Sequence, residues 1–302
     1  MKDTMIRGLI CEDTARFTAI SGQDLCEAAR NTHDLSRVCT AALGRTLLIT
    51  VMMGADLKNN QDRLTAIIKG GGPAGNIVCT AGNNGSVKGY IENPGAELPL
   101  GPDGKLDVSM AVGWFGELTI VRDLGMKEPY VGRCDLVSGE IAEDFARYFA
   151  VSEQQPSLVY LGVRVDPHTG EVRAGGGLII QPLPQCPDTV LDELQARAEG
   201  IKALAGMLDD QMGLEEALGK LFDGLEWRVT SETEPLYRCD CNRERLEKAL
   251  ISLGRAELTD IIETEHQAEL TCHFCNAKYS FNEADLRQLL QEATQDKGAI
   301  EE

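Results

Sequence analysis

The sequence predicts an α+β fold: an N-terminal core of antiparallel sheets and packed helices, a helical linker, and a small C-terminal four-cysteine zinc domain. Residues 64–94 are short β-branched runs separated by glycine and asparagine turns, which is typical of antiparallel strands. Helical apolar spacing occurs in separate blocks of the chain, which favours α+β. Four closely spaced cysteines near the C-terminal end indicate a separate metal-binding module.

The N-terminal part begins with two candidate helices. The first covers residues 24–43, and an apolar helix follows at 41–57. The apolar helix contains Arg45 and is shorter than the ~20 residues needed to span a bilayer, so we expect it to be buried and expect no membrane segment. Residues 1–17 carry several charges and no apolar signal core, so we expect the protein in the cytoplasm.

Further strands and one helix complete the predicted core, residues 1–184. A strand pair is expected around 116–125, and two extended runs flank a Pro-His-Thr-Gly turn within 157–184. Between them, residues 139–149 form a helix with one apolar face. That face consists of Ile141, Ala142, Phe145 and Phe149.

A glycine-rich stretch, GGGPAG, matches a dinucleotide-binding fingerprint by its letters alone. Gly70, Gly72 and Gly75 fit G-x-G-x-x-G. That fingerprint works because its last glycine opens a helix facing a pyrophosphate, whereas the residues that follow here, NIVCTAG, are β-branched and end in another glycine turn. We therefore predict a plain turn between two strands.

A helical linker, residues 185–231, follows the proline-rich stretch PLPQCPD at 182–188. Residues 189–211 and 213–226 have amphipathic helical spacing. The linker is interrupted by glycines, each of which costs a helix about 1 kcal/mol relative to alanine. These glycines are Gly200, Gly206, Gly213, Gly219 and Gly224. We expect a metastable segment that depends on packing against another part of the protein.

The four clustered cysteines belong to the third predicted domain, residues 232–302. Cys239 and Cys241 form a CxC motif, and Cys272 and Cys275 form a CxxC motif. Together they supply four soft ligands, enough for a closed tetrahedral zinc shell without His273. A helix after Asn242 that ends at Gly254, and another from Asn282, would give the module only a small core. Metal ligation, typically ~10 to 16 kcal/mol for structural zinc, must then supply much of its folding free energy.

The spacing of these cysteines leaves two roles open. One is a permanently structural zinc site. The other is a redox switch, because thiolates in close pairs can pass through a sulfenic acid to a disulfide, which removes the zinc ligands. The glycine-interrupted helices beside the module favour the switch, because they could lose their docking surface when the module unfolds.

The other six cysteines are isolated in the sequence, and in a reducing compartment such residues are usually small buried hydrophobes. They are Cys11, Cys26, Cys39, Cys79, Cys134 and Cys186. We expect none of them to bind metal.

Charge argues against a nucleic-acid partner. Of the net charge of −19, residues 187–302 contribute −14, from 12 basic and 26 acidic residues. A surface of that sign repels a polyanion, so we expect no nucleic-acid binding.

Three other functions compete with a redox switch. A thiol-disulfide oxidoreductase using Cys272 and Cys275 would place its CxxC at a helix N-terminus, whereas this motif lies between extended segments. A metallohydrolase needs an open coordination position that four thiolates do not leave. A zinc-ribbon adaptor protein stays as an alternative. We expect no enzymatic activity.

Five segments together resemble the heat-shock protein 33 family of redox-regulated chaperones. They are CDCNRER at 239–245, CHFCNAKYSF at 272–281, LVSGEIAEDFARYF at 136–149, SEQQPS at 152–157 and KGYIENP at 88–94. The resemblance covers nearly the whole chain. It departs from the family at LIIQPLPQC, residues 178–186, where family members usually run into small residues. This stretch contains the predicted junction between core and linker.

The resemblance implies a function and a set of partners. It implies an ATP-independent holdase that binds unfolding client proteins under oxidative stress. The reduced form would be inactive, with one zinc per chain on Cys239, Cys241, Cys272 and Cys275. The active form would be an oxidised homodimer with Cys239–Cys241 and Cys272–Cys275 disulfides, and its clients would pass to ATP-dependent foldase chaperones.

Overall fold

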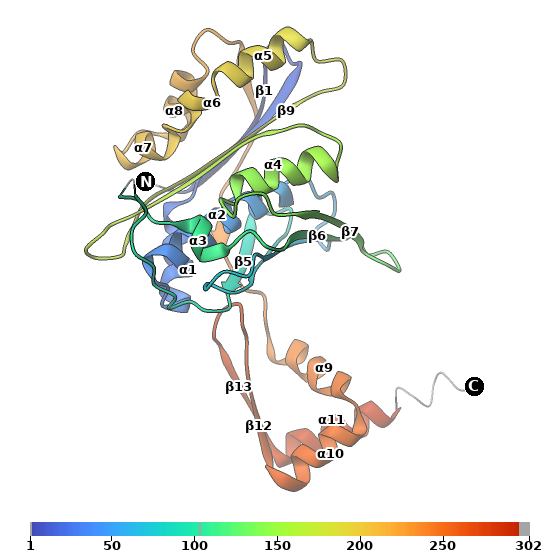
Figure 1. The fold of residues 1–302 in the computed structure, drawn as a ribbon. Coiled ribbons are helices and arrows are strands. Elements are labelled where there is room, and N and C mark those ends of the chain that lie inside the picture. Colours follow the sequence, from blue (N-terminus) through green and yellow to red (C-terminus); the bar gives the residue numbers. More distant parts are fainter. Residues whose placement is uncertain (1, 103, 296–302) are drawn as a thin grey trace. The chain divides into compact units, whose positions relative to one another are not determined.

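The computed structural model describes residues 2–102 and 104–295 (Figure 1). The chain divides into two compact units, Met1–Arg238 and Cys239–Glu302. Antiparallel sheets and packed helices build the first unit, and the second holds the four clustered cysteines. The predicted α+β class is therefore confirmed.

The first sheet has five strands in the order β10-β1-β2-β9-β8, all antiparallel. They are β1 (Thr4–Ile10), β2 (Ala15–Ser21), β8 (Leu158–Val165), β9 (Val172–Pro182) and β10 (Trp227–Thr233). The predicted pair within 157–184 is confirmed as β8 and β9. The sequence analysis did not identify β1 and β2, although their side chains alternate between buried and partly exposed as in a half-buried strand.

The second sheet has six strands in the order β11-β5-β4-β3-β6-β7. They are β3 (Arg63–Lys69), β4 (Ile77–Ala81), β5 (Ser86–Ile91), β6 (Glu117–Asp123), β7 (Tyr130–Asp135) and β11 (Leu236–Tyr237). Strands β3, β4 and β5 form the predicted antiparallel meander. The pair expected around 116–125 is wrong in its bounds: that stretch holds only β6, and its partner β7 begins at Tyr130. Strand β11 joins β5 in parallel.

The GGGPAG stretch is a turn between β3 and β4, as predicted. It needs glycine because a neighbouring chain segment lies against its backbone: a Cβ on Gly70 would lie 2.2 Å from the Val112 carbonyl oxygen, and one on Gly72 would lie 2.4 Å from that of Ala111.

Four helices complete the core of the first unit: α1 (Gln23–His33), α2 (Arg37–Gly54), α3 (Val108–Val112) and α4 (Ala142–Val151). Helix α2 contacts strands of both sheets and supplies much of the main hydrophobic cluster. It is long and apolar enough to cross a membrane, but 89% of it is buried inside the protein, as expected of a core helix. Asp34, in the left-handed region at φ 50°, ends α1 before α2 begins.

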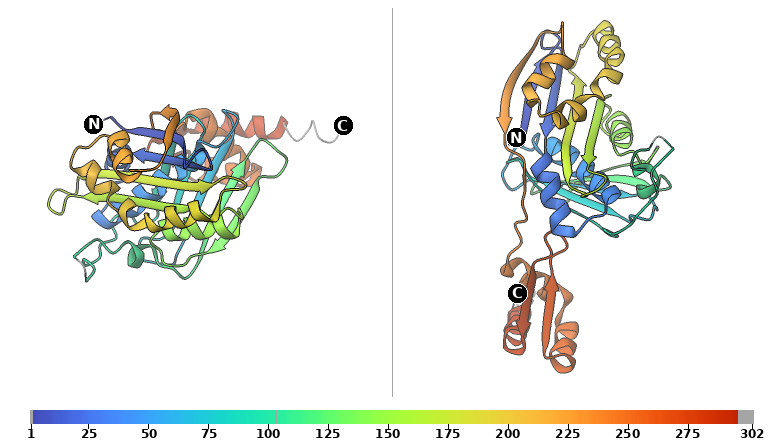
Figure 2. Two further views of the ribbon diagram at one scale, coloured as in Figure 1. Left: turned by 90° about the horizontal axis from the view of Figure 1, so that it is seen from above. Right: turned by 90° about the vertical axis from the view of Figure 1, so that its left-hand side faces the viewer.

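The helical segment after β9 consists of four short helices that pack on one face of the five-stranded sheet (Figure 2). They are α5 (Asp188–Ala196), α6 (Ala198–Ile201), α7 (Leu204–Asp209) and α8 (Leu214–Leu221). Leu204, Leu218 and Phe222 share a buried cluster with Phe17 and Leu178 of the sheet. The expected dependence of these helices on packing is therefore met within the first unit.

Two boundaries differ from the sequence expectation. The linker was expected to be helical to residue 231, but residues 227–233 form β10, which pairs with the edge strand β1. The second compact unit begins at Cys239 and not at residue 232, because β10 and β11 are paired into the sheets of the first unit. The free edges of the two sheets offer this stretch strand partners, and that pairing decides its conformation in place of the helical spacing of the residues before it.

The second unit contains three helices and one hairpin: α9 (Arg243–Leu253), α10 (Arg255–Thr264), β12 (Gln267–Thr271), β13 (Lys278–Asn282) and α11 (Glu283–Gln295). The Asn242 side chain caps α9 by accepting from the Arg245 amide at 2.9 Å, and Gly254 ends it, as predicted. Helix α10 was not predicted. The core among the described residues is small: Leu250, Leu258, Ile262, Phe281, Leu286 and Leu289.

Candidate metal centre

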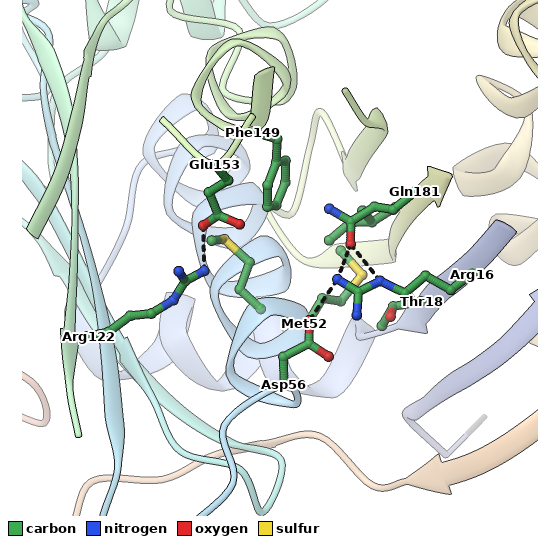
Figure 3. A pocket seen from close by; sticks show the side chains of 10 residues that line it. Arg16, Thr18, Met52, Asp56, Arg122, Phe149, Glu153 and Gln181 are labelled. Carbon is green, nitrogen blue, oxygen red and sulfur yellow. Dashed lines mark hydrogen bonds and ion pairs between the residues drawn. The ribbon is translucent and has the colours of Figure 1, made fainter. Parts of the chain in front are cut away.

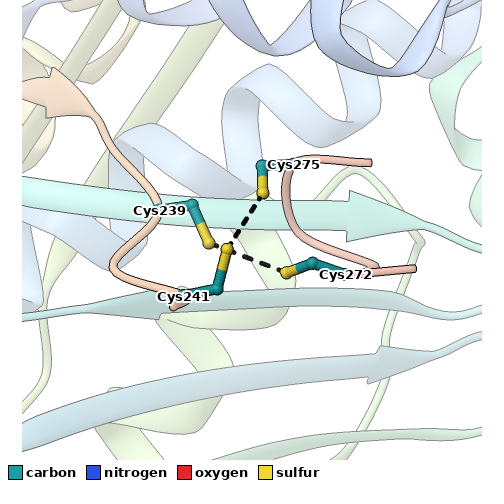
Figure 4. A group of neighbouring side chains, drawn as sticks. All are labelled: Cys239, Cys241, Cys272 and Cys275. Atoms are coloured by element: carbon teal, nitrogen blue, oxygen red, sulfur yellow. Dashed lines mark hydrogen bonds between the residues drawn. The ribbon is translucent and has the colours of Figure 1, made fainter. Parts of the chain in front are cut away.

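The four clustered cysteines converge in space (Figure 4). Their sulfur atoms all lie within 4.8 Å of one another. Two close separations join the two motifs: 3.7 Å between the Sγ atoms of Cys239 and Cys272, and 3.3 Å between those of Cys241 and Cys275. Within the described part of the chain, no other group of three or more His, Cys, Asp or Glu side chains is arranged to hold a metal ion.

The CxxC motif occupies the turn of the β12–β13 hairpin. The Cys272 amide donates to the Ala277 carbonyl at 2.9 Å, and the amides of Cys275 and Asn276 both donate back to the Cys272 carbonyl. Asn276 adopts the left-handed conformation, φ 56°, which closes the turn. This tight turn brings the two thiols together between extended segments, as the sequence indicated.

The CxC motif lies on the stretch between β11 and α9. The side chains of Cys239 and Cys241 point toward each other across a curve of the chain (Figure 4). The residue between them, Asp240, instead forms an ion pair with Arg245 at 2.6 Å. The chain then turns into α9 at Asn242, whose backbone is still extended.

The arrangement of the sulfurs fits a single four-coordinate metal ion. Tetrahedral zinc with Zn–S bonds of about 2.3 Å needs sulfur separations of about 3.8 Å. The observed separations of 3.3 and 3.7 Å are within a few tenths of an ångström of that value. The four-cysteine cluster is therefore compatible with a metal site.

The surroundings of the Cys241 thiol favour its ionised form. Burial opposes its ionisation, but hydrogen bonds from Tyr279 and from the neighbouring thiols outweigh burial and lower the pKa of Cys241 to about 7. Burial raises the pKa of Cys275. The cluster thus favours a thiolate at Cys241 even before a metal binds.

Tyr279 is a site residue that the sequence analysis missed. Its hydroxyl lies 3.3 Å from the Cys241 sulfur and 3.3 Å from the Cys241 carbonyl oxygen, and the hydrogen bond to Cys241 raises the pKa of Tyr279 to about 12. Tyr279 and the buried Phe281 lie on the same face of β13. The period-two pattern of KYSFN would have identified both as inward-facing.

The remaining sequence candidates are not part of the cluster. His273 is not among the converging ligands. Five of the six isolated cysteines are buried, as predicted, whereas Cys186 is partly exposed. Burial raises the pKa of Cys134 to about 11, which makes it a poor nucleophile.

A small hollow in the first unit is lined by charged side chains (Figure 3). Arg16 bonds to Gln181 at 2.7 Å and lies 3.5 Å from Asp56, while Arg122 pairs with Glu153. Because these charges neutralise one another, the hollow offers no arrangement that indicates a reaction.

The fold and the cysteine cluster define a class: an α+β core that precedes a small module built around four thiol ligands. The family model described as Hsp33 protein matches residues 3–282, and this chain belongs to that family. The 33 kDa chaperonin of Alkaliphilus metalliredigens is 44% identical, with 97% of this chain and 100% of the relative covered. That of Clostridioides difficile is 42% identical with the same coverage.

A solved structure agrees with these relatives. The 33 kDa chaperonin, or heat shock protein 33 homolog, of Thermotoga maritima is 36% identical with a TM-score of 0.83, and the match covers 98% of this chain and 100% of that one. The family is one of chaperones, which bind client proteins.

Proposed function

We propose that this protein is an ATP-independent holdase whose activity is controlled by the redox state of Cys239, Cys241, Cys272 and Cys275. The observation that carries this proposal is the convergence of four sulfurs within 4.8 Å in a module with a small apolar core. The reduced protein binds one zinc ion per chain through these residues and is inactive. The chaperone core consists of residues 1–184 with β10 and β11 paired into its sheets, α5 to α8 form the metastable linker, and the redox-switch domain begins at Cys239.

Zinc is the metal that this donor set favours. Four thiolates are soft ligands, and a closed tetrahedral shell is the usual structural zinc site. Bound zinc supplies folding free energy, typically ~10 to 16 kcal/mol in apparent terms. Six buried apolar side chains cannot hold the second unit without that contribution.

Oxidation removes the ligands. With hydrogen peroxide as oxidant, each pair of thiolates gives up two electrons to form one disulfide, and one peroxide takes up these electrons and two protons from solvent to become two waters. We propose the pairs Cys239–Cys241 and Cys272–Cys275. In the folded cluster the sulfurs of different motifs are as close as 3.3 Å, so proximity does not select the pairing. Pairs local in sequence stay close when the module unfolds, whereas a Cys239–Cys272 bridge would staple the module together.

Loss of the module then releases the linker. The apolar faces of α5 to α8, which are buried against the five-stranded sheet, become available to unfolding clients. We propose that the oxidised protein acts as a homodimer in the cytoplasm and passes clients to ATP-dependent foldase chaperones. No enzymatic turnover is needed. The CxxC lies in a hairpin turn and not at a helix N-terminus, which argues against the oxidoreductase alternative.

The test is suppression of aggregation of a thermally unfolding reporter protein, with bound zinc measured in parallel. Peroxide-treated protein should suppress aggregation and contain no zinc, whereas reduced protein should contain one zinc and suppress little. A disulfide-reduction assay on the same samples should show no turnover. Equal suppression by both forms would contradict redox control, and turnover in the reductase assay would favour the oxidoreductase.

A further inference from the structure

Residues 227–238, which we name the strap, form the covalent path between the helical segment and the four-cysteine module (Figure 1). The strap begins with β10 on the outer edge of the five-stranded sheet and ends with β11 on the outer edge of the six-stranded sheet. Any unfolding that spreads along the chain from Cys239 to α8 must pass through the strap.

The first half of the strap is held mostly by its backbone. The side chains of β10 are exposed except at its two ends, and the pairing with β1 is irregular between Arg7 and Gly8. Trp227 anchors its beginning by packing edge-on against Phe222 at 5.8 Å, and Arg228 pairs with an exposed Asp13. Elements with so little buried apolar surface open at low free energy.

The second half has a stronger anchor in Tyr237. Strand β11 is two residues long, and the amides on either side of Tyr237, those of Leu236 and Arg238, donate to the carbonyls of Gly85 and Val87, each at 2.9 Å. The Tyr237 hydroxyl donates to the Gly89 carbonyl at 2.9 Å.

His33, the buried last residue of α1, makes the second hydrogen bond to this hydroxyl. Its Nε2 lies 2.9 Å from the Tyr237 oxygen, and the two rings meet edge to face at 6.4 Å. Because the single phenolic hydrogen is given to Gly89, Nε2 must carry a proton and donate to Tyr237. Tyr237 thereby ties the strap to a helix and a strand of the main core, one residue before the second unit begins.

We propose that Tyr237 is a latch that determines how fast unfolding of the four-cysteine module reaches the helices α5 to α8. The proposal rests on the proposed function above. While the four-cysteine module is folded, β11 has folded structure on both sides of it along the chain. Once the module unfolds, Tyr237 is the first side-chain anchor that must release before β10 can peel from β1. The buried Pro235 and the partly exposed Trp227 follow it.

The test variant is Tyr237→Phe, which keeps the ring and removes both hydrogen bonds. Tyr130→Phe, on the exposed face of edge strand β7, is the matched control. In reduced protein, the Leu236 and Arg238 amides of Tyr237→Phe should exchange about twofold to tenfold faster per hydrogen bond lost. Zinc content and the rate of thiol oxidation should equal those of the control, because the module is untouched.

After peroxide treatment, the decisive readout is the interval between zinc release and loss of amide protection in α5 to α8. This interval should shorten in Tyr237→Phe and in His33→Gln, and the double variant should be no faster than Tyr237→Phe. An interval equal to that of the control overturns the latch. Zinc release that is accelerated as much as the loss of protection also overturns it, because that result would mean general destabilisation of the protein. These readouts involve no client protein. Failure of the protein as a holdase would therefore refute the proposed function, and the interval would still test the latch.

Discussion

At the scale of single residues, the reactive groups of the site are the four cysteine sulfurs and the Tyr279 hydroxyl beside them. The Tyr279 hydroxyl, 3.3 Å from the Cys241 sulfur, is placed to hold that thiolate in position. Such partners of metal ligands orient them and tune their basicity. The pKa values of Cys241, Cys275 and Tyr279 therefore depend on one another.

Replacing one ligand tests the assignment of the metal site. Cys241→Ser should lose most of its bound zinc and unfold the second unit, because a hydroxyl is a poor zinc ligand and no spare thiol is part of the cluster. Cys186→Ser, which alters a partly exposed cysteine outside the cluster, is the control. Zinc content by metal analysis, with far-UV circular dichroism, measures the effect. Full zinc occupancy in Cys241→Ser would refute the assignment.

A second residue predicts how stability depends on pH. Asp3 accepts hydrogen bonds from the Leu25 and Asp24 amides at the start of α1, and burial raises the pKa of Asp3 to about 6. In the unfolded chain its pKa is about 3.9. The folded state therefore binds the proton more tightly, and this contribution is full below pH ~4 and lost as pH rises through about 6.

Asp3→Asn removes this titration and keeps an acceptor. The free energy of unfolding of wild type relative to Asp3→Asn should fall by about 2 to 3 kcal/mol between acidic and neutral pH. Urea unfolding of both reduced proteins at matched pH values measures the difference. A difference that stayed constant, or grew toward neutral pH, would show that folding does not raise the pKa of Asp3.

At the scale of elements, the helical segment is stable only through its packing. Its helices are four to nine residues long, too short to persist alone, and they bury leucines against β2 and β9. Three of its glycines lie within helices and leave room for a Cβ. Nothing lies within 4 Å of a Cβ at Gly200, and the nearest side-chain atoms would be 3.7 Å away at Gly206 and 4.0 Å away at Gly219. The helical segment is thus less stable than it would be with alanine at these three positions.

Alanine at these three glycines should stabilise the docked segment. Each substitution should add up to about 1 kcal/mol, because alanine restricts the unfolded chain and fits the helix. The triple variant should then need more oxidant or a higher temperature for activation. Gly224→Ala is the control with the opposite expectation, since Gly224 has φ +77° and alanine there is strained. Activation of the triple variant at the wild-type threshold would contradict this role of the glycines.

Local signals were enough to predict several elements. Asn242 and Gly254 marked the ends of α9, and glycine turns marked the meander of β3 to β5. Where partners lie far apart in sequence, local signals failed. Strand β10 pairs with β1 more than two hundred residues away, and only the free edge of that sheet decides its conformation. Cysteine spacing identified the four thiols, but their juxtaposition with Tyr279 depends on the register of the β12–β13 hairpin.

At the scale of the whole molecule, stability is divided unequally. The first unit holds both large sheets, with α2 buried among them, whereas the second has a small core among its described residues. Under the proposed function, metal ligation supplies the rest of the second unit's stability. The helical segment and the strap lie between these extremes, since they are docked on sheet faces and edges. Oxidation of four thiols can therefore unfold part of the chain and leave the rest intact.

The central claim is that activation works by unfolding, and amide hydrogen exchange on reduced and oxidised protein tests it most directly. Oxidised protein should lose protection across residues 239–295 and across α5 to α8, while strands β3 to β6 stay protected. Client binding by oxidised protein whose helices α5 to α8 kept full protection would contradict the account, because the binding surface would then lie in the core.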